Sequence, residues 1–129
     1  TELLAAALLD MELHNLTDTD NLNVVAFEKE TMDKLGLIPE IAPRYRATYF
    51  SHIIGGYAAG YYSYLWAEVL DTDAFEAFKE HGVFDKNTAD SFRKNILEKG
   101  GTEDPMTLYR GFRGADPSLE PLLKNRGLK

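Results

Sequence analysis

Residues 49–66 read YFSHIIGGYAAGYYSYLW and hold five of the chain's seven tyrosines, its only tryptophan and three of its glycines. We expect residues 56–70 to form a helix that turns by about 100° per residue. One face then presents a row at the i, i+4, i+7, i+11 spacing: Tyr57, Tyr61, Tyr64 and Glu68. The opposite arc is apolar and would pack in the core: Ala58, Ala59, Tyr62, Leu65, Trp66, Val69 and Leu70. The pattern therefore predicts a helix with one core face and one row of phenolic hydroxyl groups.

Helical patterns also lie upstream of this stretch. Apolar periodicity predicts helices over residues 2–14 and 21–35. Pro39 and Pro43 follow them, and proline favours an extended connection at that point. The two helices are expected to bury these side chains: Leu3, Leu4, Ala7, Leu8 and Met11 in the first, and Val24, Val25, Met32 and Leu35 in the second.

Short helices are predicted downstream, over residues 72–80, 87–99, 105–112 and 118–125. Their expected starts are Asp71 or Thr72, Asn87, Asp104 and Asp116. The last two are aspartates followed by proline, which is typical of an N-cap with proline at the first helical position. No useful β-type alternation occurs, so the predicted fold class is all-α, with residues 1–129 as a single compact helical unit.

Composition narrows the functional classes. A chain of 129 residues with 44% hydrophobic and 27% charged residues fits one globular domain. The absence of cysteine excludes disulfides, thiolate catalysis and Cys-ligated metal sites. No segment approaches the ~18 apolar residues of a membrane span, and the first ten residues lack the basic region of a signal peptide.

The negative charge is concentrated in the first third of the chain. Nine acids and two bases give residues 1–40 a net charge of −7, while twelve of each leave residues 41–129 neutral. This acidic face disfavours nucleic-acid binding.

The tyrosine row suggests a chemical role. A phenol donates a hydrogen bond without carrying charge, so it can stabilise an oxygen that becomes negative during acyl transfer. His52 could add a second donor, because it precedes Gly55 and Gly56, where the backbone can bend close to a ligand. The alternative is that these aromatic side chains are ordinary core. His14 and His81 lie at predicted helix ends and fit solvated or capping roles.

Two arginines flank Tyr45 just after Pro43. Arg44 and Arg46 could bind a carboxylate by fork-like pairing, or they could balance the acidic first third of the chain.

Other catalytic patterns are missing: there is no His-Glu-x-x-His pair, no G-x-S-x-G elbow and no phosphate-binding loop. The chain by itself lacks a complete catalytic constellation.

The residues quoted above resemble the C-terminal region of the thimet oligopeptidase family of zinc metallopeptidases, with the best match to its bacterial peptidyl-dipeptidase branch. The resemblance rests on Pro43-Arg44-Tyr45, on Tyr49 to Ile53 and on Gly55 to Trp66. It continues upstream through residues 5–11 and 26–28 and downstream through residues 123–128, which look like the family's chain end. It therefore covers essentially all 129 residues.

The resemblance implies a fold, a cofactor and site residues. Family members are largely helical, two-lobed shells around a channel, and their zinc is held by a His-Glu-x-x-His helix and a later glutamate, none of which this chain contains. The resemblance therefore implies the C-terminal part of a zinc peptidase, inactive alone and without bound zinc. It implies that His52, Tyr57 and Tyr64 stabilise the oxyanion, that Tyr61 lines the same subsite, and that the Gly55-Gly56 loop moves over the peptide. Arg44 or Arg46 is a hypothesis for holding the substrate's C-terminal carboxylate.

Two functions are left open by the sequence. The first is the substrate-binding part of a zinc peptidyl-dipeptidase, whose partners would be short peptides and the rest of the peptidase chain, with no nucleic acid or membrane. The second is an autonomous all-α module that binds peptides without cleaving them. The first helix begins without an initiator Met, which is consistent with a fragment. The expected location is the cytoplasm, with periplasm or export possible because any targeting signal would lie upstream.

Overall fold

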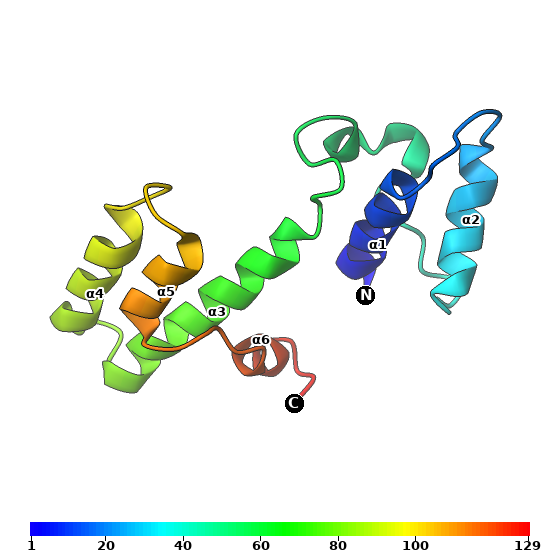
Figure 1. The fold of residues 1–129 in the computed structure, drawn as a ribbon. Helices are drawn as coiled ribbons and strands as arrows, with labels where there is room; N and C mark the ends of the chain where they lie inside the picture. Colours follow the sequence, from blue (N-terminus) through cyan, green and yellow to red (C-terminus); the bar gives the residue numbers. More distant parts are fainter. The chain divides into compact units, whose positions relative to one another are not determined.

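The computed structural model describes all 129 residues, and its regular elements are all helical (Figure 1). The α-helices are α1 (Glu2–His14), α2 (Val24–Lys34), α3 (Ser63–His81), α4 (Lys86–Phe92), α5 (Pro105–Arg113) and α6 (Glu120–Asn125). Two 3-10 turns, Ala47–Tyr49 and Ser51–Ile54, and a π-helical turn, Arg93–Leu97, complete the elements. The predicted all-α class is confirmed. None of these helices combines the length and the apolar character needed to cross a membrane.

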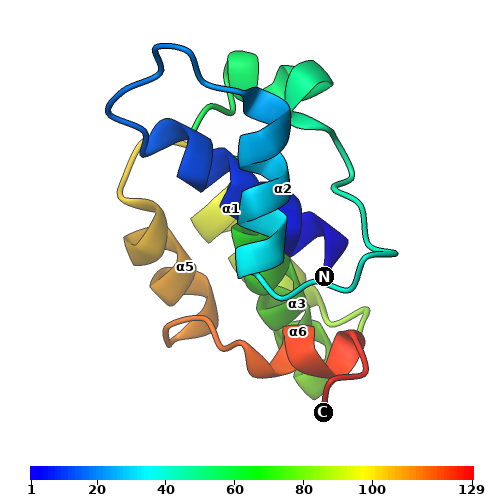
Figure 2. The same cartoon turned by 90° about the vertical axis from the view of Figure 1, so that its right-hand side faces the viewer.

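The sequence predicts that residues 1–129 form one compact unit. In the structure they form two compact units, Thr1–Leu65 and Trp66–Lys129. Each unit has its own packing and is described by itself. In the first unit, α1 and α2 lie side by side in both views (Figures 1 and 2). The tyrosine-rich stretch belongs almost entirely to this first unit, which therefore holds the candidate site.

Helix α1 forms where predicted, but it buries a different face. Its buried residues are Ala5, Ala6, Ala7, Leu9 and Asp10, so Ala7 is the only member of the predicted stripe that is fully buried, and Leu4 is 51% exposed. The reason is that α1 contacts two clusters at once. Ala6 and Ala7 pack with Phe50, Ile53 and Tyr61, while Ala5 and Leu9 pack with Met32 of α2. Small alanine side chains allow this close approach on two adjacent sides of the helix.

Helix α2 begins at Val24, after Asn23, whose side chain accepts a hydrogen bond from the Ala26 N–H at 3.0 Å. Met32 is buried as predicted, but Val25 and Leu35 are exposed. Glu28 and Thr31 occupy buried positions instead. The buried face contains a carboxylate because Glu28 accepts hydrogen bonds from residues of the loop that follows the helix.

The predicted helix over residues 56–70 is wrong in its first half. Residues 55–62 form consecutive turns, and α3 begins at Ser63 and continues without a break to His81. The expected start at Asp71 or Thr72 is therefore absent. Ala59 has φ = +52°, in the left-handed region that a continuous α-helix of L-residues cannot contain. Tyr62 and Trp66, which were expected in the core, are 53% and 46% exposed.

In the second unit, two of the helix starts are fixed by aspartate caps. Asp104 accepts a hydrogen bond from the Thr107 N–H at 2.8 Å, with Pro105 at the first helical position, as predicted for α5. Helix α4 is capped by Asp85, whose carboxylate accepts from the Thr88 N–H, so the start predicted at Asn87 lies two residues too late. Helix α6 begins at Glu120, so the start predicted at Asp116 is wrong.

Aromatic contacts hold the helices of the second unit together. Phe78 of α3 lies 6.0 Å from Phe92 of α4, and Phe92 lies 5.2 Å from Phe112 of α5, measured between ring centroids. Both pairs are close to edge-on, the arrangement that aromatic rings prefer. These three rings connect the α-helices that come from three different segments of the unit.

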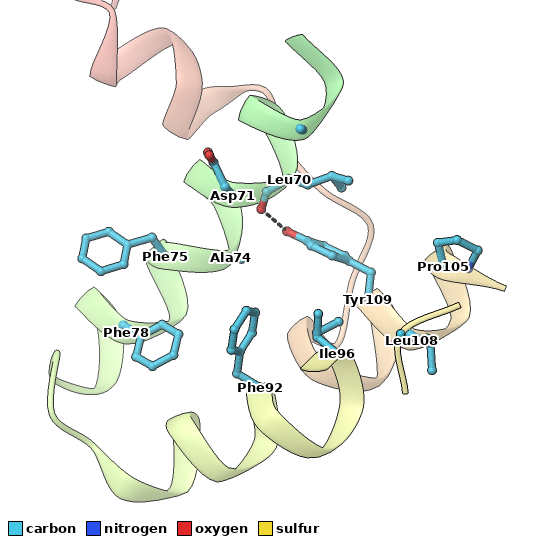
Figure 3. A pocket seen from close by; sticks show the side chains of 12 residues that line it. Leu70, Asp71, Ala74, Phe75, Phe78, Phe92, Ile96, Pro105, Leu108 and Tyr109 are labelled. Carbon is cyan, nitrogen blue, oxygen red and sulfur yellow. Dashed lines mark hydrogen bonds between the residues drawn. The ribbon is translucent and has the colours of Figure 1, made fainter. Parts of the chain in front are cut away.

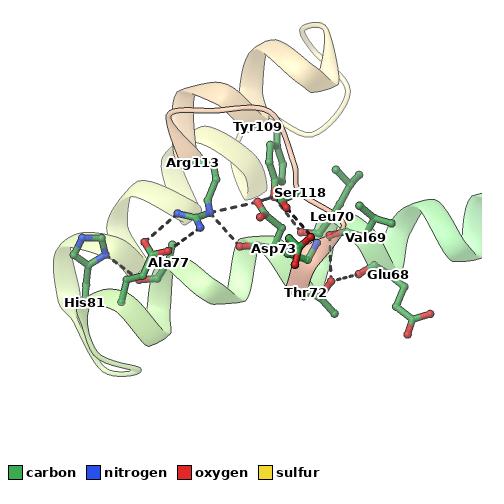
Figure 4. A network of polar contacts seen from close by, with 12 residues as sticks. Glu68, Val69, Leu70, Thr72, Asp73, Ala77, His81, Tyr109, Arg113 and Ser118 are labelled. Atoms are coloured by element: carbon green, nitrogen blue, oxygen red, sulfur yellow. Dashed lines mark hydrogen bonds and ion pairs between the residues drawn. The ribbon is translucent and has the colours of Figure 1, made fainter. Parts of the chain in front are cut away.

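A polar network also joins α3 to α5 in this unit (Figure 4). The Tyr109 hydroxyl donates to the buried Asp73 carboxylate at 2.6 Å. Arg113 donates to the Asp73 carbonyl and pairs through both terminal nitrogens with Glu80. Burial and the neighbouring Asp73 carboxylate raise the pKa of Tyr109 well above its usual range. Each buried polar group in this network therefore has a partner.

Replacing Tyr109 by phenylalanine is expected to destabilise the second unit by about 1–3 kcal/mol, because the buried Asp73 carboxylate loses its closest donor. The folded state holds the phenol proton more tightly than the unfolded state. The wild-type protein should therefore keep this contribution below pH ~10 and lose it as pH rises further. Hydrogen exchange of residues 105–113, compared between the two proteins as a function of pH, measures both effects. Equal exchange in both would contradict the role assigned to this bond.

Candidate functional site

A concave opening of about 260 Å³ lies beside His52 in the first unit. Its lining comes from segments that are far apart in the sequence: Leu3, Arg44, Tyr45, His52, Tyr61 and Tyr64. Helix α1, the loop before the first 3-10 turn, the second 3-10 turn, the turns of residues 55–62 and the start of α3 all contribute. The opening contains an imidazole, a guanidinium and several phenols, so hydrogen-bond donors dominate its chemistry.

His52 is the centre of an aromatic cluster. Its ring centroid lies 4.9 Å from Tyr45 and 5.3 Å from Tyr61, and about 6 Å from the other two predicted site phenols, Tyr57 and Tyr64 (6.0 and 6.3 Å). Tyr57 and Tyr64 stack on each other at 5.2 Å. The predicted histidine and three tyrosines are therefore brought together, although the turns of residues 55–62 do this rather than one helical face.

The three tyrosines differ in exposure. Tyr57 and Tyr64 are 42% and 39% exposed, whereas Tyr61 is only 2% exposed and packs edge-on against Phe50 at 4.8 Å. Tyr61 therefore supports the floor of the opening and Tyr64 lines it from a partly exposed position, while Tyr57 stacks on Tyr64. The alternative that these aromatic side chains are ordinary core therefore holds for Tyr61 but not for Tyr57 or Tyr64.

His52 carries a polar atom with no partner. Its Nδ1 is buried and makes no hydrogen bond within the protein. Buried polar atoms are normally paired, and an unpaired one costs free energy. An unpaired nitrogen of this kind on a residue that lines the opening makes His52 a candidate for function.

Two phenols of the cluster, those of Tyr61 and Tyr64, have raised pKa values and keep their protons around neutral pH. Interaction with the Tyr57 hydroxyl, followed by desolvation, raises the pKa of Tyr64 above its usual value. Burial raises the pKa of Tyr61, and the nearby Arg44 opposes that effect. Both groups therefore act as neutral hydrogen-bond donors.

The structure separates the two arginines of the predicted carboxylate site. Arg44 lines the opening, with its guanidinium carbon 5.6 Å from the centroid of the Tyr45 ring, and it forms no ion pair within the chain. Arg46 is bonded through Nε to the buried Glu28 carboxylate, which also accepts from the Ala47 N–H at 2.6 Å. The guanidinium of Arg46 is therefore engaged in the fold, whereas that of Arg44 is free to meet an anion.

Two further expectations can be compared with the structure. Gly55 and Gly56 are exposed, and a Cβ at either position would meet no atom within 4 Å, so crowding does not explain why glycine stands there. Glu68, expected on the phenol face, instead pairs with Arg126 in the second unit, at 2.9 Å between Arg126 Nε and Glu68 Oε1.

Sequence reasoning missed two residues of this region. Tyr45 stacks on Phe50 at 5.2 Å and contacts His52. Asp10, with no exposed surface, accepts hydrogen bonds from the Ala59 and Tyr61 N–H groups, each at 2.9 Å. A signal for Asp10 existed in the sequence, because it is a carboxylate that directly follows the apolar run of the first helix.

A larger cavity, of about 500 Å³, lies within the second unit between α3, α4 and α5 (Figure 3). Its walls are mostly apolar and include Phe75, Phe78, Phe92 and Ile96. The Tyr109 hydroxyl in its wall points to the Leu70 carbonyl at 3.3 Å (Figure 3). Because it lacks convergent polar groups, this cavity is a weaker candidate for chemistry than the smaller opening.

Comparisons with known proteins bear on the whole chain. The sequence profile of peptidase family M3 matches residues 1–128. The dipeptidyl carboxypeptidase of Escherichia coli (strain K12) is 45% identical over 99% of this chain and 19% of its own length. Oligopeptidase A of the same organism is 57% identical over 62% of this chain and 12% of its own length. The probable cytosolic oligopeptidase A of Arabidopsis thaliana is 42% identical over 95% of the chain. The chain spans about a fifth of the length of the first of these relatives.

Proposed function

The chain belongs to peptidase family M3, and from this we propose that the full-length protein is a zinc-dependent peptidase that hydrolyses short peptides. This chain supplies part of the peptide-binding and oxyanion-stabilising surface and is inactive alone. Release of dipeptides from a free C-terminus is the proposed mode, because the relative matched over 99% of the chain is a dipeptidyl carboxypeptidase. Internal cleavage is the alternative, because other relatives are oligopeptidases.

The observation that carries the proposal is the group of hydrogen-bond donors beside the opening at His52. There, the unpartnered Nδ1 of His52 lies in one cluster with the partly exposed phenols of Tyr57 and Tyr64. When a peptide carbonyl is attacked by water, its oxygen gains negative charge. Neutral donors that are already in place can stabilise that oxygen, and one such donor contributes about 3–4 kcal/mol. Tyr64 and Tyr57 are the proposed donors, and His52 is the third.

We propose that the zinc is bound by residues outside this chain. The structure contains no group of three or more His, Asp or Glu side chains that could hold a metal ion. In the full-length enzyme the bound zinc would polarise the carbonyl and activate water. The residues of this chain would hold the peptide and stabilise the developing charge.

The experiment that tests the function uses purified full-length protein. Short peptides with a free or an amidated C-terminus are incubated with it, and the products are identified by mass spectrometry. Elemental analysis measures the metal content. We expect one zinc per chain and C-terminal dipeptides from the free peptides. Internal cuts alone would favour the oligopeptidase mode, and binding without cleavage would favour a non-catalytic peptide-binding module.

Arg44→Ala is expected to reduce the preference for a free C-terminus by about tenfold or more, because a charge-assisted pair with the substrate carboxylate is lost. The measured quantity is the ratio of kcat/KM for free and amidated peptides. Arg46→Ala is the matched control. It removes the contact with Glu28 and should leave this ratio close to that of the wild type. If neither variant changes the ratio, the substrate carboxylate is held elsewhere.

A further inference from the structure

The turns of residues 55–62 are held by two kinds of hydrogen bond. Within the turns, the N–H groups of Tyr57, Ala58 and Gly60 donate to backbone carbonyls at 2.9–3.2 Å. The N–H groups of Ala59 and Tyr61 instead donate to the two carboxylate oxygens of Asp10, each at 2.9 Å. The two residues that flank Gly60 are thus fixed by a side chain that lies 49 and 51 positions earlier in the sequence.

Both oxygens of the Asp10 carboxylate are used in the contact with this turn. Its residue has no exposed surface, and the remaining polar neighbour is His14, whose Nδ1 lies 2.9 Å from Oδ1 and 2.8 Å from the Asp10 carbonyl oxygen. A buried carboxylate is costly unless it is hydrogen-bonded. Here both oxygens accept from backbone N–H groups of a single turn, one on each side of Gly60.

The turn that Asp10 binds is conformationally strained. Ala59 has φ = +52°, and an alanine in this region costs on the order of 1 kcal/mol relative to its preferred conformations. Such a conformation persists only when surrounding contacts fix it. The hydrogen bonds that Asp10 accepts are contacts of this kind. The two partly exposed phenols are close by in the sequence, because Tyr57 lies two residues before Ala59 and Tyr64 three residues after Tyr61.

We propose that Asp10 is a positioning residue, which binds the backbone of residues 59–61 and thereby fixes where Tyr57 and Tyr64 present their hydroxyls beside His52. This inference rests on the proposed function for its catalytic consequence. Its structural part stands on the two hydrogen bonds alone. Asparagine cannot replace Asp10, because an amide offers one acceptor oxygen and would place its own NH₂ against the second N–H.

The first test needs no variant. Hydrogen exchange of the wild-type full-length protein, followed by mass spectrometry of peptides that cover residues 57–62, reports whether the amides of this turn, those of Ala59 and Tyr61 included, are hydrogen-bonded. We expect slowly exchanging amides in this stretch, although it lies outside any regular helix. Complete exchange within seconds would overturn the proposal, whatever the protein's activity.

The second test is a double-mutant cycle on kcat in the full-length protein. Asp10→Asn is expected to lower kcat by about 10- to 100-fold, with KM little changed, because displaced groups lose alignment with the reacting carbonyl. In a Tyr64→Phe background the same substitution should have an effect about tenfold smaller, because its main target is already gone. If Asp10→Asn acted only by destabilising the fold, it would lower kcat by the same factor in the wild-type and Tyr64→Phe backgrounds, and the cycle would show no coupling between the two residues.

The matched control is Asp73→Asn, which makes the same chemical change at a buried aspartate of the second unit. Its effect on kcat should be independent of Tyr64. If Asp10→Asn does not yield folded protein, His14→Ala decides the question, because the His14 side chain is 35% exposed and contacts Asp10. A weaker effect on kcat with the same coupling to Tyr64 is expected, and its absence overturns the proposal. If the slow amides are found but Tyr64→Phe does not lower kcat, the proposed function fails and the structural role of Asp10 stands.

Discussion

Tyr64→Phe in the full-length protein is expected to lower kcat by about 10²- to 10³-fold while KM stays within about twofold of the wild type. This is the size of effect that follows removal of one donor to a developing oxyanion. The hydroxyl is proposed to act mainly in the transition state, and the loss of such an interaction lowers kcat and kcat/KM together. The ring of Tyr64 packs against Tyr57 and Tyr61 at 5.2 and 5.1 Å, and phenylalanine keeps those contacts.

The chain offers a matched control two residues away. Tyr62 lies just before the same helix and is 53% exposed, but it makes no ring contact with the cluster around His52. Tyr62→Phe should therefore leave kcat within about twofold of the wild type. Steady-state kinetics on one peptide, with enzyme concentration corrected for zinc content, compare the two variants. A tenfold rise in KM with unchanged kcat for Tyr64→Phe would assign the hydroxyl to ground-state binding and contradict the proposed role.

The pH dependence gives an independent check on Tyr64. Its pKa is raised above the usual value, chiefly by interaction with Tyr57, so the hydroxyl keeps its proton where an ordinary tyrosine begins to lose it. The contribution of Tyr64 to kcat should therefore persist up to pH ~10. The ratio of wild-type to Tyr64→Phe kcat should stay constant below that pH.

The proximity of the candidate residues could be predicted from the sequence, but their geometry could not. His52 and the three phenols are close together in the sequence, so any compact local structure would gather them. The helical face that was expected to align them does not exist. In its place, the N–H groups of Ala59 and Tyr61 donate to the side chain of Asp10, 49 and 51 positions away in the sequence. A long-range contact thus overrode a local periodicity.

Long-range partners also explain what else was missed. The different roles of Arg44 and Arg46 depend on Glu28, which is 18 residues from Arg46 and shows no pattern linking it to either arginine. Sequence signals were more successful for features that depend only on neighbouring residues, such as helix caps. Asp104 and Pro105 begin α5 as predicted because a cap needs only the next three residues. The same dipeptide type at Asp116 and Pro117 does not begin α6, so this signal alone does not decide a helix start.

Phe50→Ala is expected to be the most damaging single change to the first unit, at about 3–5 kcal/mol. Phe50 has no exposed surface. It stacks on Tyr45 at 5.2 Å, meets Tyr61 edge-on at 4.8 Å, and belongs to the cluster that contains Ala6 and Ala7 of α1. Truncation removes this buried ring and leaves a cavity between α1 and the floor of the opening.

The expected consequence reaches the site as well as the core. A loss of 3–5 kcal/mol increases the population of locally open states by about 10²- to 10³-fold or more, so amides of α1 should exchange faster by that factor. Because Tyr61 and His52 both pack against Phe50, activity should fall with the protection. Phe84→Ala is the matched control, since that ring is 99% exposed and its loss should change exchange little. Equal protection of α1 in Phe50→Ala and wild type would show that Phe50 is not what holds the tyrosine cluster against the first helix.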